Sequence, residues 1–533
     1  MALFVLDVQT GTVTQLTRDS MNIARSPDGN FDWAPDEQAL VVAVDLQLQS
    51  WGYDTDLVVI DLASRRARPL VTQPGMDGRP CWSPDGRWIA FATHHQDLAY
   101  RVGWPAMVRA RGGSVITFPQ DKTPMGFGSC QWPAGSHAFH YVSSLGMTLR
   151  LVRADLASRT ATVLPSASDL HLAFEDNRSV SADGRWMAFT RESLTMPAEL
   201  FAVALDVEGR PVGTPRQLTQ LAPDFEIGGL VHTEELNWLS PDGKFTIHGL
   251  LLTPASARVD GSVRQPLPTL LYFIGGPSMV RRGFAEDGWN GAYLPLASRG
   301  YAVLMANTRG RGGYGPELWD AIRTGKNRAR DPLADALAGL DLLVARGIAD
   351  PNRTGVLGHS YGAYMTAYTI TQTSRFKAAV IHDGCCLSLM GGGYFGGPPF
   401  GAVTDLISRD LFGIHNPFDA AERARLVEES PGLHADRVRT PALLLSGGKK
   451  QPFGPYDANI PNPWIESGPL YRSLRRFNVP AAFFVYDEPH VFVRPAAIAD
   501  DLTRTAEWLD YWVRGMPFPD PERAKEYGQK KPP

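Results

Sequence analysis

The first 220 residues contain an internal repeat, which restricts the possible folds more than any other feature of the chain. Four turn motifs begin at intervals of 49, 50 and 48 residues, and they are Trp33-Ala-Pro-Asp, Trp82-Ser-Pro-Asp-Gly, Trp132-Pro-Ala-Gly and Val180-Ser-Ala-Asp-Gly. After the turns come short β-rich runs such as RWIAFAT (87–93), and a second strand pair such as DLVVIDLASRRARPL (56–70) also recurs. Hairpins of this kind, with four strands to a repeat, are typical of propeller blades.

The repeat occurs four times in full, and one further hairpin precedes it. The first residues, LFVLDVQTGTVTQLT (3–17), match the second half of a repeat whose first half is absent. The sequence therefore predicts a β-propeller of about four to five blade units over residues 1–230 that is small, open or truncated at its N-terminus. An unrelated β-sandwich is the weaker alternative, because the repeats share their register and their turn residues.

The pattern changes near residue 235, where apolar runs begin to alternate with helical stretches. Buried strands are predicted at TLLYFIGGP (269–277), YAVLMANTRG (301–310), KAAVIHDG (377–384), PALLLSGG (441–448) and PAAFFVYDEPH (480–490). Short apolar strands separated by helices indicate a mostly parallel sheet with helices on both faces. Residues 231–533 are therefore predicted to form an α/β domain, with its ligand site at the carboxyl ends of the strands.

Composition excludes several other classes of protein. The chain has 533 residues, too many for one core, and its net charge of −4 offers no basic surface for nucleic acid. We expect no signal peptide, because the first residues lack a basic region, and no membrane span, because no apolar run is long enough. Four cysteines, Cys81, Cys130, Cys385 and Cys386, do not suggest a disulfide framework or a metal site. We therefore expect a cytoplasmic protein with reduced thiols and no cofactor or metal.

The segment GVLGHSYGAYMT (355–366) carries the strongest chemical signal. It puts Ser360 between Gly358 and Gly362 where a strand is expected to become a helix. A turn this tight requires glycine two residues before and after the serine, and it lifts the hydroxyl clear of the sheet. The pattern predicts a nucleophilic serine, although G-x-S-x-G alone also occurs by chance.

Further motifs make the chain similar to the prolyl oligopeptidase family of serine peptidases, and most similar to its acylaminoacyl-peptidase and dipeptidyl-peptidase branch. The motifs are GGP (275–277), NTRGRGGYG (307–315, similar to the family's NYRGSxGYG), DPNRTGVLGHSYGAYMT (350–366) and EPHVF (488–492, where the family has EGHGF). The resemblance implies a propeller that covers an α/β-hydrolase domain. It also implies a Ser-Asp-His triad that acts on peptides in a cavity between the two domains.

The resemblance assigns roles to individual residues. Ser360 would attack the scissile carbonyl, and His490 would accept its proton. The N–H of Tyr361 would supply half of the oxyanion hole, and an N–H of the Gly275–Gly276 turn would supply the other half. One position departs from the family here, because Ile274 stands where the family's H-G-G-P motif has histidine.

The larger departure from the family concerns the acid of the triad. The family has H-G-x-x-D-x-x-V-P after the strand at 441–448, but counted without a gap Lys450 stands where that acid should be. A short insertion over 449–455 would align Asp457 with the family's aspartate, 33 residues before His490. We therefore predict Asp457 as the triad acid, with Glu466 as the alternative.

Three functions are compatible with these residues. The leading interpretation is a serine peptidase that cleaves short peptides, with the propeller excluding folded proteins. An esterase or an amidase on an unusual acyl substrate would use the same triad. A pseudoenzyme that binds peptides would have kept the serine and lost the acid. The expected partner is a short peptide or other acyl substrate, without nucleic acid or membrane, and self-association into a homo-oligomer is compatible with the sequence.

Overall fold

The computed structural model divides into two compact units, Met1–Ser193 with Pro197–Pro223 and residues 194–196 with 224–533. The boundary predicted from the sequence was at residues 230 and 231. The structure describes residues 2–17, 21–23, 30–45, 54–94, 103–118, 125, 130–133, 137–164, 178–181, 183–193, 196–223, 229–276, 280, 292–324, 329–384, 416, 418–449, 463–464 and 466–527.

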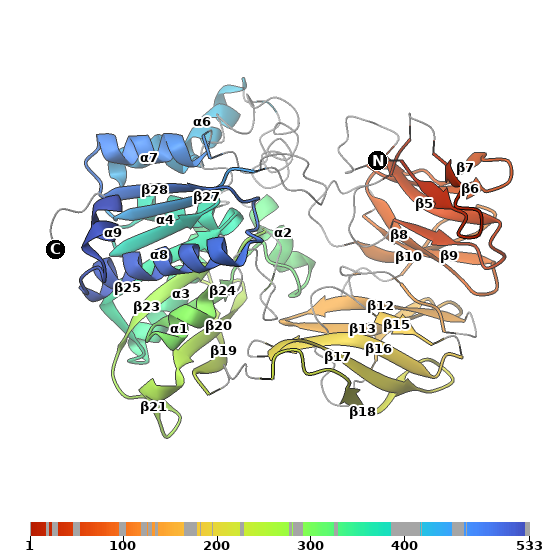
Figure 1. The fold of residues 1–533 in the computed structure, drawn as a ribbon, viewed down its shortest axis with the longest axis horizontal. Coiled ribbons are helices and arrows are strands. Elements are labelled where there is room, and N and C mark those ends of the chain that lie inside the picture. The colour runs from red at the N-terminus through yellow and green to blue at the C-terminus, as the bar shows by residue number, and fades with distance from the viewer. Residues whose placement is uncertain are drawn as a thin grey trace. The chain divides into compact units, whose positions relative to one another are not determined.

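The first unit consists of small antiparallel sheets that follow the sequence repeats (Figure 1). An N-terminal hairpin pairs β1 (Phe4–Leu6) with β2 (Val13–Gln15). The next two sheets contain β3 (Asn22–Ile23), β4 (Phe31–Trp33), β5 (Ala39–Asp45), β6 (Asp56–Asp61) and β7 (Ala67–Val71), then β8 (Asp77–Trp82), β9 (Trp88–Thr93), β10 (Trp104–Arg109) and β11 (Ile116–Thr117). The last two contain β12 (Ala138–Leu145), β13 (Thr148–Asp155) and β14 (Thr160–Val163), then β15 (Arg178–Val180), β16 (Trp186–Ser193), β17 (Met196–Leu205) and β18 (Pro211–Gln217).

The repeated Ser-x-Asp-Gly segment is a hairpin turn held by its own side chains. In the sheet of β8–β11, the Ser83 hydroxyl donates to the Asp85 carboxylate (2.6 Å), and the Ser83 N–H donates to the Trp88 carbonyl (2.8 Å). Gly86 closes this turn with a φ of 71°, a left-handed conformation in which glycine has no steric penalty. Gly184 has a φ of 70° in the equivalent turn of the sheet of β15–β18. The sequence repeat is therefore a repeat of turn geometry.

Neighbouring sheets of this unit are joined by contacts that recur at the period of the repeat. The Asp32 carboxylate accepts a hydrogen bond from the Trp82 N–H (2.7 Å), 50 residues further along the chain. The Trp132 indole N–H donates to the carbonyl of Cys81 (3.2 Å), and a disulfide joins Cys81 to Cys130. The expectation that all four cysteines are reduced thiols is therefore wrong for this pair, because the repeat brings the two side chains together from consecutive sheets.

The disulfide predicts a measurable contribution to stability. It closes a segment of 49 residues, so its removal should lower the free energy of unfolding by about 2–4 kcal/mol. We expect Cys130→Ser to lower the urea midpoint, and we expect dithiothreitol to lower the midpoint of the wild-type protein to the same value without affecting the variant. A wild-type midpoint that does not respond to the reductant would show that the bond does not form in solution.

The second unit is built on one sheet of eight strands in the order β19-β20-β24-β23-β25-β26-β27-β28 (Figure 1). The first two strands form an antiparallel hairpin at one edge, and from β24 to β28 every neighbouring pair is parallel. The strands are β19 (Val231–Leu239), β20 (Thr246–Pro254), β23 (Leu267–Phe273), β24 (Ala302–Asn307), β25 (Ala349–His359), β26 (Ala378–His382), β27 (Ala442–Gly447) and β28 (Ala481–Tyr486). A small hairpin pairs β21 (Arg258–Val259) with β22 (Ser262–Val263).

Helices connect these strands and cover the sheet. They are α1 (Tyr293–Ser298), α2 (Pro316–Thr324), α3 (Arg330–Ala345), α4 (Tyr361–Gln372), α6 (Ala420–Glu428), α7 (Ser467–Arg476), α8 (Pro495–Arg514) and α9 (Pro521–Glu526), with 3-10 turns η1 (Ala255–Ala257) and η4 (Pro431–Arg437). Helices α4 and α8 both pack on the central strands β25 and β26. Every residue of β23, β24, β26 and β27 is buried, which explains why these strands read as uninterrupted apolar runs.

Trp238 fixes the edge hairpin against helix α3. Its indole N–H donates to the Asp335 carbonyl (2.8 Å), and its ring lies against Gly249 and Gly339. A Cβ at Gly339 would come within 2.5 Å of the ring, so the glycine in the middle of α3 serves this packing. The antiparallel hairpin is thereby part of the second unit, although its S-P-D-G turn matches the repeat of the first.

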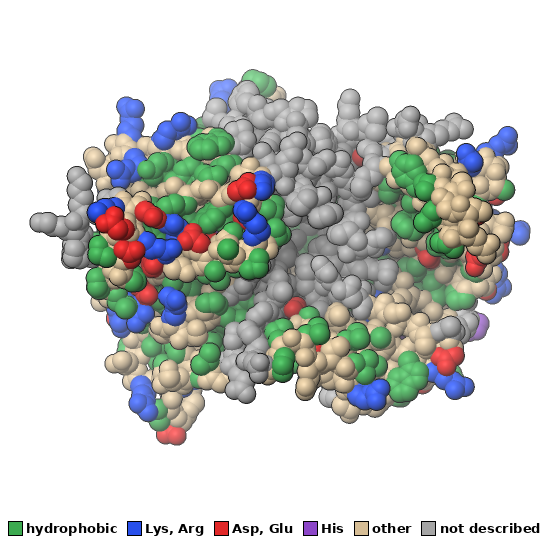
Figure 2. Space-filling view, viewed as in Figure 1, with side chains coloured by type: hydrophobic (Ala, Val, Ile, Leu, Met, Phe, Trp, Pro, Cys, Tyr) green, Lys and Arg blue, Asp and Glu red, His purple; other side chains and the backbone are tan. Residues whose placement is uncertain are grey.

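Charged side chains of both signs lie together over α8 and α9 (Figure 2). Arg504 contacts Asp500 and Glu526 (both 2.7 Å), and Arg523 contacts Asp500 (2.8 Å) and Glu507 (2.9 Å). This network holds α9 on α8. Among the helices of the described residues, none combines the length and the apolar character that a membrane crossing needs.

Candidate active site

Ser360 stands in a sharp turn between strand β25 and helix α4. Its backbone has φ 58° and ψ −121°, a conformation that is strained for a residue with a side chain. A Cβ on Gly362 would lie 2.0 Å from the Phe273 carbonyl oxygen, and one on Gly358 would lie 2.4 Å from the Gly362 carbonyl oxygen. The glycines on either side of Ser360 are therefore required by close backbone contacts, as the sequence predicts.

His490 lies between Ser360 and a buried carboxylate. Its Nε2 is 3.0 Å from the Ser360 Oγ, and its Nδ1 is 3.0 Å from the Oδ2 of Asp383. With the carboxylate as acceptor, Nδ1 carries the proton and Nε2 is left to accept one from the serine hydroxyl. The three side chains form one continuous line of hydrogen bonds.

Asp383 follows strand β26, one strand closer to Ser360 than the position where the acid was predicted. Its side chain is fully buried, and its Oδ1 accepts a hydrogen bond from the Gly447 N–H (3.1 Å). The acid prediction is corrected in this way: the carboxylate at His490 Nδ1 belongs to Asp383. Asp457 lies outside the described residues. Glu466 is buried at the start of α7, where it precedes Ser467.

The sequence contains a pattern that could have indicated Asp383 as the acid. HDG (382–384) ends a predicted buried strand, and carboxyl ends of neighbouring parallel strands meet at one edge of a sheet. The resemblance instead implies an acid in the loop after β27, since the family has its aspartate there. Ser360 follows β25 and His490 follows β28, so an acid at the end of either intervening strand, β26 or β27, would lie between them.

The described residues at the end of β27 and directly after it support the segment that carries His490. The Lys449 N–H donates to the Glu488 carbonyl (2.9 Å), and a Cβ on Gly447 would come within 2.5 Å of the Pro489 carbonyl oxygen. The buried Glu488 carboxylate accepts a hydrogen bond from the Val493 N–H (2.9 Å). These contacts close the segment 488–493 into a defined turn.

His359, the residue before the serine, holds His490 from the other side. Its Nε2 donates to the backbone carbonyl of His490 (3.1 Å), since a carbonyl can only accept. The two imidazole rings stack with their centroids 4.6 Å apart. His359 thereby contacts both the backbone and the ring of the residue that faces Ser360.

The predicted oxyanion-hole residues lie beside the serine. The Gly275 Cα is close to the turn at Ser360. A Cβ on Gly275 would lie 3.3 Å from the His359 carbonyl oxygen and 3.6 Å from the Ser360 Cβ. Gly276 has a φ of 55°, which glycine adopts without strain. Tyr361 is the first residue of α4, so its N–H points out of the positive end of the helix.

Burial controls the electrostatics of these groups. It raises the pKa of the Asp383 carboxyl well above its usual range, which the Gly447 N–H opposes by stabilising the ionised form. Burial lowers the pKa of His490 to about 4 from an ordinary value of 6.5. The Asp383 carboxylate at 3.0 Å acts in the opposite direction on His490. His490 is thus neutral at pH 7 and able to accept a proton.

Metal binding is not needed to explain this cluster. His359, Asp383 and His490 offer ligand atoms within 4.8 Å of one another, the one such group found in the described part of the chain. Each of the three already has a hydrogen-bond partner within the cluster or its backbone. The positions of these side chains are therefore explained by their own hydrogen bonds.

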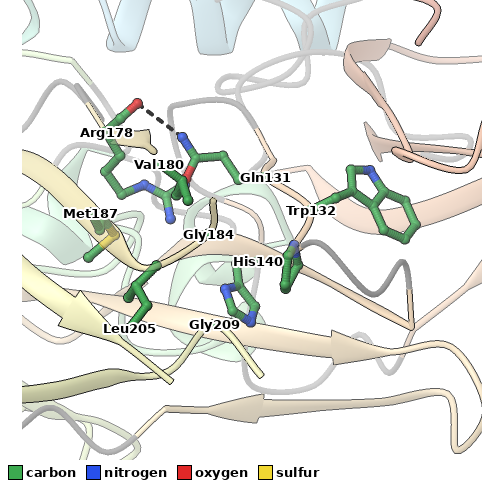
Figure 3. A pocket seen from close by; sticks show the side chains of 10 residues that line it. Gln131, Trp132, His140, Arg178, Val180, Gly184, Met187, Leu205 and Gly209 are labelled. Carbon is green, nitrogen blue, oxygen red and sulfur yellow. Dashed lines mark hydrogen bonds between the residues drawn. The ribbon is translucent and has the colours of Figure 1, made fainter. Parts of the chain in front are cut away.

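A small cavity lies elsewhere, among the sheets of the first unit (Figure 3). Its volume is about 20 Å³, and Gln131, His140 and Arg178 supply polar atoms to its lining. The Gln131 amide donates to the Arg178 carbonyl (3.0 Å). A cavity of this size holds one water molecule and no substrate.

Comparison with known proteins leads to one family. Residues 287–394 match the prolyl oligopeptidase family. The uncharacterised peptidase YuxL of Bacillus subtilis is 32% identical over 257 residues, 47% of this chain and 35% of that protein. The acylamino-acid-releasing enzyme 1 of Oryza sativa is 23% identical over 473 residues, 81% of this chain and 57% of that protein. The chain is thus similar to members of the prolyl oligopeptidase family. It spans well under two thirds of the length of these relatives.

Solved structures agree with this relation at the level of the fold. A puromycin-hydrolysing peptidase of Mycobacterium tuberculosis matches 96% of this chain and 83% of its own with a TM-score of 0.67, at 19% sequence identity. An acylaminoacyl peptidase of Pyrococcus horikoshii matches 97% of this chain and 86% of its own with a TM-score of 0.61, at 16% identity. The predicted fold class, a β-propeller with an α/β-hydrolase domain, is confirmed.

Replacing the acid tests its position. Asp383→Asn keeps the shape of the side chain and its contact with Gly447, but an amide no longer fixes the tautomer of His490. We expect kcat to fall by about 10⁴-fold with little change in KM, because loss of the acid acts on the transition state. Asp457→Asn and Glu466→Gln are the controls, and both should keep kcat within a few fold. A large loss in Asp457→Asn with a mild effect in Asp383→Asn would restore the sequence prediction.

The buried histidine also predicts a pH profile. His490 must be neutral to accept the serine proton, and a lowered pKa keeps it neutral at lower pH. We expect kcat/KM to be constant above pH 6.5 and to fall on the acid side with a midpoint between about 4 and 6.5. Measurement of initial rates from pH 4 to 8 gives the midpoint. A midpoint above 7 would contradict the dominance of burial over the Asp383 charge.

Proposed function

We propose that this protein is a serine peptidase that hydrolyses short peptides through Ser360, His490 and Asp383. The observation that carries the proposal is the line of two 3.0 Å hydrogen bonds from the Ser360 hydroxyl through His490 to Asp383. A serine hydroxyl is a weak nucleophile until a base removes its proton, and a histidine held in one tautomer by a buried acid is that base.

The reaction follows from the geometry. Ser360 Oγ attacks the carbonyl carbon of the substrate while its proton moves to His490 Nε2, and the carbonyl oxygen becomes negatively charged. The N–H groups of Tyr361 and Gly276 stabilise that oxygen. His490 then protonates the leaving amine, which departs and leaves an ester on Ser360. Water, deprotonated by His490, hydrolyses this ester and restores the enzyme.

The substrate class rests on the relatives. The Oryza protein is named an acylamino-acid-releasing enzyme, and the Mycobacterium structure is titled a puromycin-hydrolysing peptidase. These names favour amide over ester substrates for the same triad. We further propose that the propeller limits the substrate to short peptides, which is supported by the presence of a propeller in the first unit. The pseudoenzyme alternative assumed that no acid reaches the histidine. The contact between Asp383 and His490 speaks against that assumption.

Ser360→Ala tests the proposal directly. The hydroxyl contributes little to packing, so the variant should keep the melting temperature of the wild type within about 1–2 °C, while hydrolysis of a library of short peptide amides and esters falls by at least 10³-fold. A fluorophosphonate probe should label the wild type and not the variant. A folded wild type that neither reacts with the probe nor cleaves any member of the library would identify a binding module, and faster cleavage of esters alone would identify an esterase.

A further inference from the structure

Arg311 lies in the loop after β24, within NTRGRGGYG, where the similar family pattern has a serine. Its side chain is 98% buried beneath the candidate oxyanion loop. The guanidinium donates to the backbone carbonyls of three consecutive residues: Nη2 to Ile274 (2.8 Å), Nη1 to Gly275 (3.0 Å) and Nη1 also to Gly276. Its Cζ is 5.6 Å from the centroid of the Tyr361 ring. One side chain thus contacts both segments that are predicted to form the oxyanion hole.

These contacts determine where amide hydrogens point. A peptide group is planar and trans, so the carbonyl of one residue and the N–H of the next point in opposite directions within one rigid unit. Fixing the Gly275 carbonyl therefore fixes the N–H of Gly276, and fixing the Ile274 carbonyl fixes the N–H of Gly275. The Gly275–Gly276 segment consists of residues with wide conformational freedom, so an external contact is needed to select one orientation.

The other half of the hole is oriented in the same way by the helix. The Ser360 carbonyl accepts hydrogen bonds from the N–H groups of Ala363 (3.0 Å) and Tyr364 (3.1 Å). These bonds fix the peptide that carries the Tyr361 N–H. Helix α4 thus orients the Tyr361 N–H by holding the Ser360 carbonyl of the same peptide group. In the same way, Arg311 contacts the Gly275 carbonyl, which belongs to the peptide group of the Gly276 N–H.

We propose that Arg311 is a positioning residue that orients the Gly276 N–H toward the oxyanion through the Gly275 carbonyl. The proposal rests on the serine peptidase function proposed above, and it deepens that function by assigning this chain's own support for the oxyanion hole. Arg311 does not touch the substrate. It acts through the peptide between Gly275 and Gly276.

Charge strengthens the effect. Burial lowers the pKa of Arg311 to about 10, which leaves it protonated at pH 7. Charged donors form stronger hydrogen bonds than neutral ones, and a donor bound to a carbonyl polarises that peptide so that its N–H becomes a better donor. The position of Ile274 adds to the argument, because an apolar side chain there offers no hydrogen bond to the loop, whereas Arg311 binds its backbone.

The experiment compares Arg311→Met and Arg311→Lys with the wild type, with kcat expressed per Ser360 that a fluorophosphonate labels at completion. Arg311→Met keeps the bulk and loses every hydrogen bond, so kcat should fall by about 10- to 100-fold, somewhat less than the loss of a whole oxyanion donor. KM and the acid-side midpoint of kcat/KM should not change, since neither depends on the hole. Arg311→Lys should recover part of kcat.

Arg309→Met is the matched control. Arg309 belongs to the same loop and is 94% buried, but its partners are carboxylates, with Asp335 at 2.7 Å and Asp242 at 2.8 Å. Its loss should lower the melting temperature and leave kcat per labelled serine within about threefold of wild type.

The following outcomes apply when the wild type is active and Ser360→Ala is inactive. The proposal would be overturned by an unchanged kcat per labelled serine in Arg311→Met, or by an equal fall of kcat in Arg309→Met. An effect of Arg311→Met on KM alone would also overturn it. If the wild type itself shows no hydrolysis that depends on Ser360, the proposed function fails instead, so the two failures are distinguished by the same set of proteins.

Discussion

The close packing of the turn at Ser360 against the end of strand β23 is the constraint on which the site depends. Gly362 lies so near the Phe273 carbonyl that no side chain fits between them. This approach presses the start of α4 onto the strand that leads into Ile274, Gly275 and Gly276. As a result, the serine, the Tyr361 N–H and the glycine loop share one edge of the sheet. Any residue larger than glycine at position 362 would push Ser360 and Tyr361 away from the Gly275–Gly276 segment.

Around that contact, three buried polar side chains, those of Asp383, His359 and Arg311, have hydrogen bonds to backbone atoms. Asp383 binds the Gly447 N–H and His490, His359 binds the His490 carbonyl, and Arg311 binds three carbonyls. A buried charge is stable only where hydrogen bonds replace its hydration. Here the hydrogen bonds that replace the lost hydration also orient the side chains of the candidate site.

Motifs that depend on local geometry could be predicted from the sequence. The Ser-x-Asp-Gly turns, the glycines around Ser360 and the apolar runs of the parallel strands each reflect a steric or hydrophobic rule that acts over a few residues. The position of His490 was also predicted, through a resemblance of short motifs. The acid was expected at Asp457, because its assignment followed the order of motifs along the chain, whereas the carboxylate found at His490 Nδ1 is that of Asp383. The disulfide was missed, since Cys81 and Cys130 meet only when consecutive repeats pack side by side.

The two-part architecture and the candidate nucleophile Ser360 were predictable from the sequence by itself, because they depend on strand periodicity and turn sterics. His490 was predicted through the resemblance of short motifs. Only the tertiary structure shows which carboxylate contacts His490 and which side chain binds the carbonyls of the Gly275–Gly276 segment. Asp383 is 107 residues from His490 along the chain, and Arg311 is 36 residues from Gly275. Such pairs come together through the order of strands in the sheet, in which β26 lies between β25 and β27 and β24 lies beside β23. That order follows from packing over the whole unit, and no local pattern encodes it.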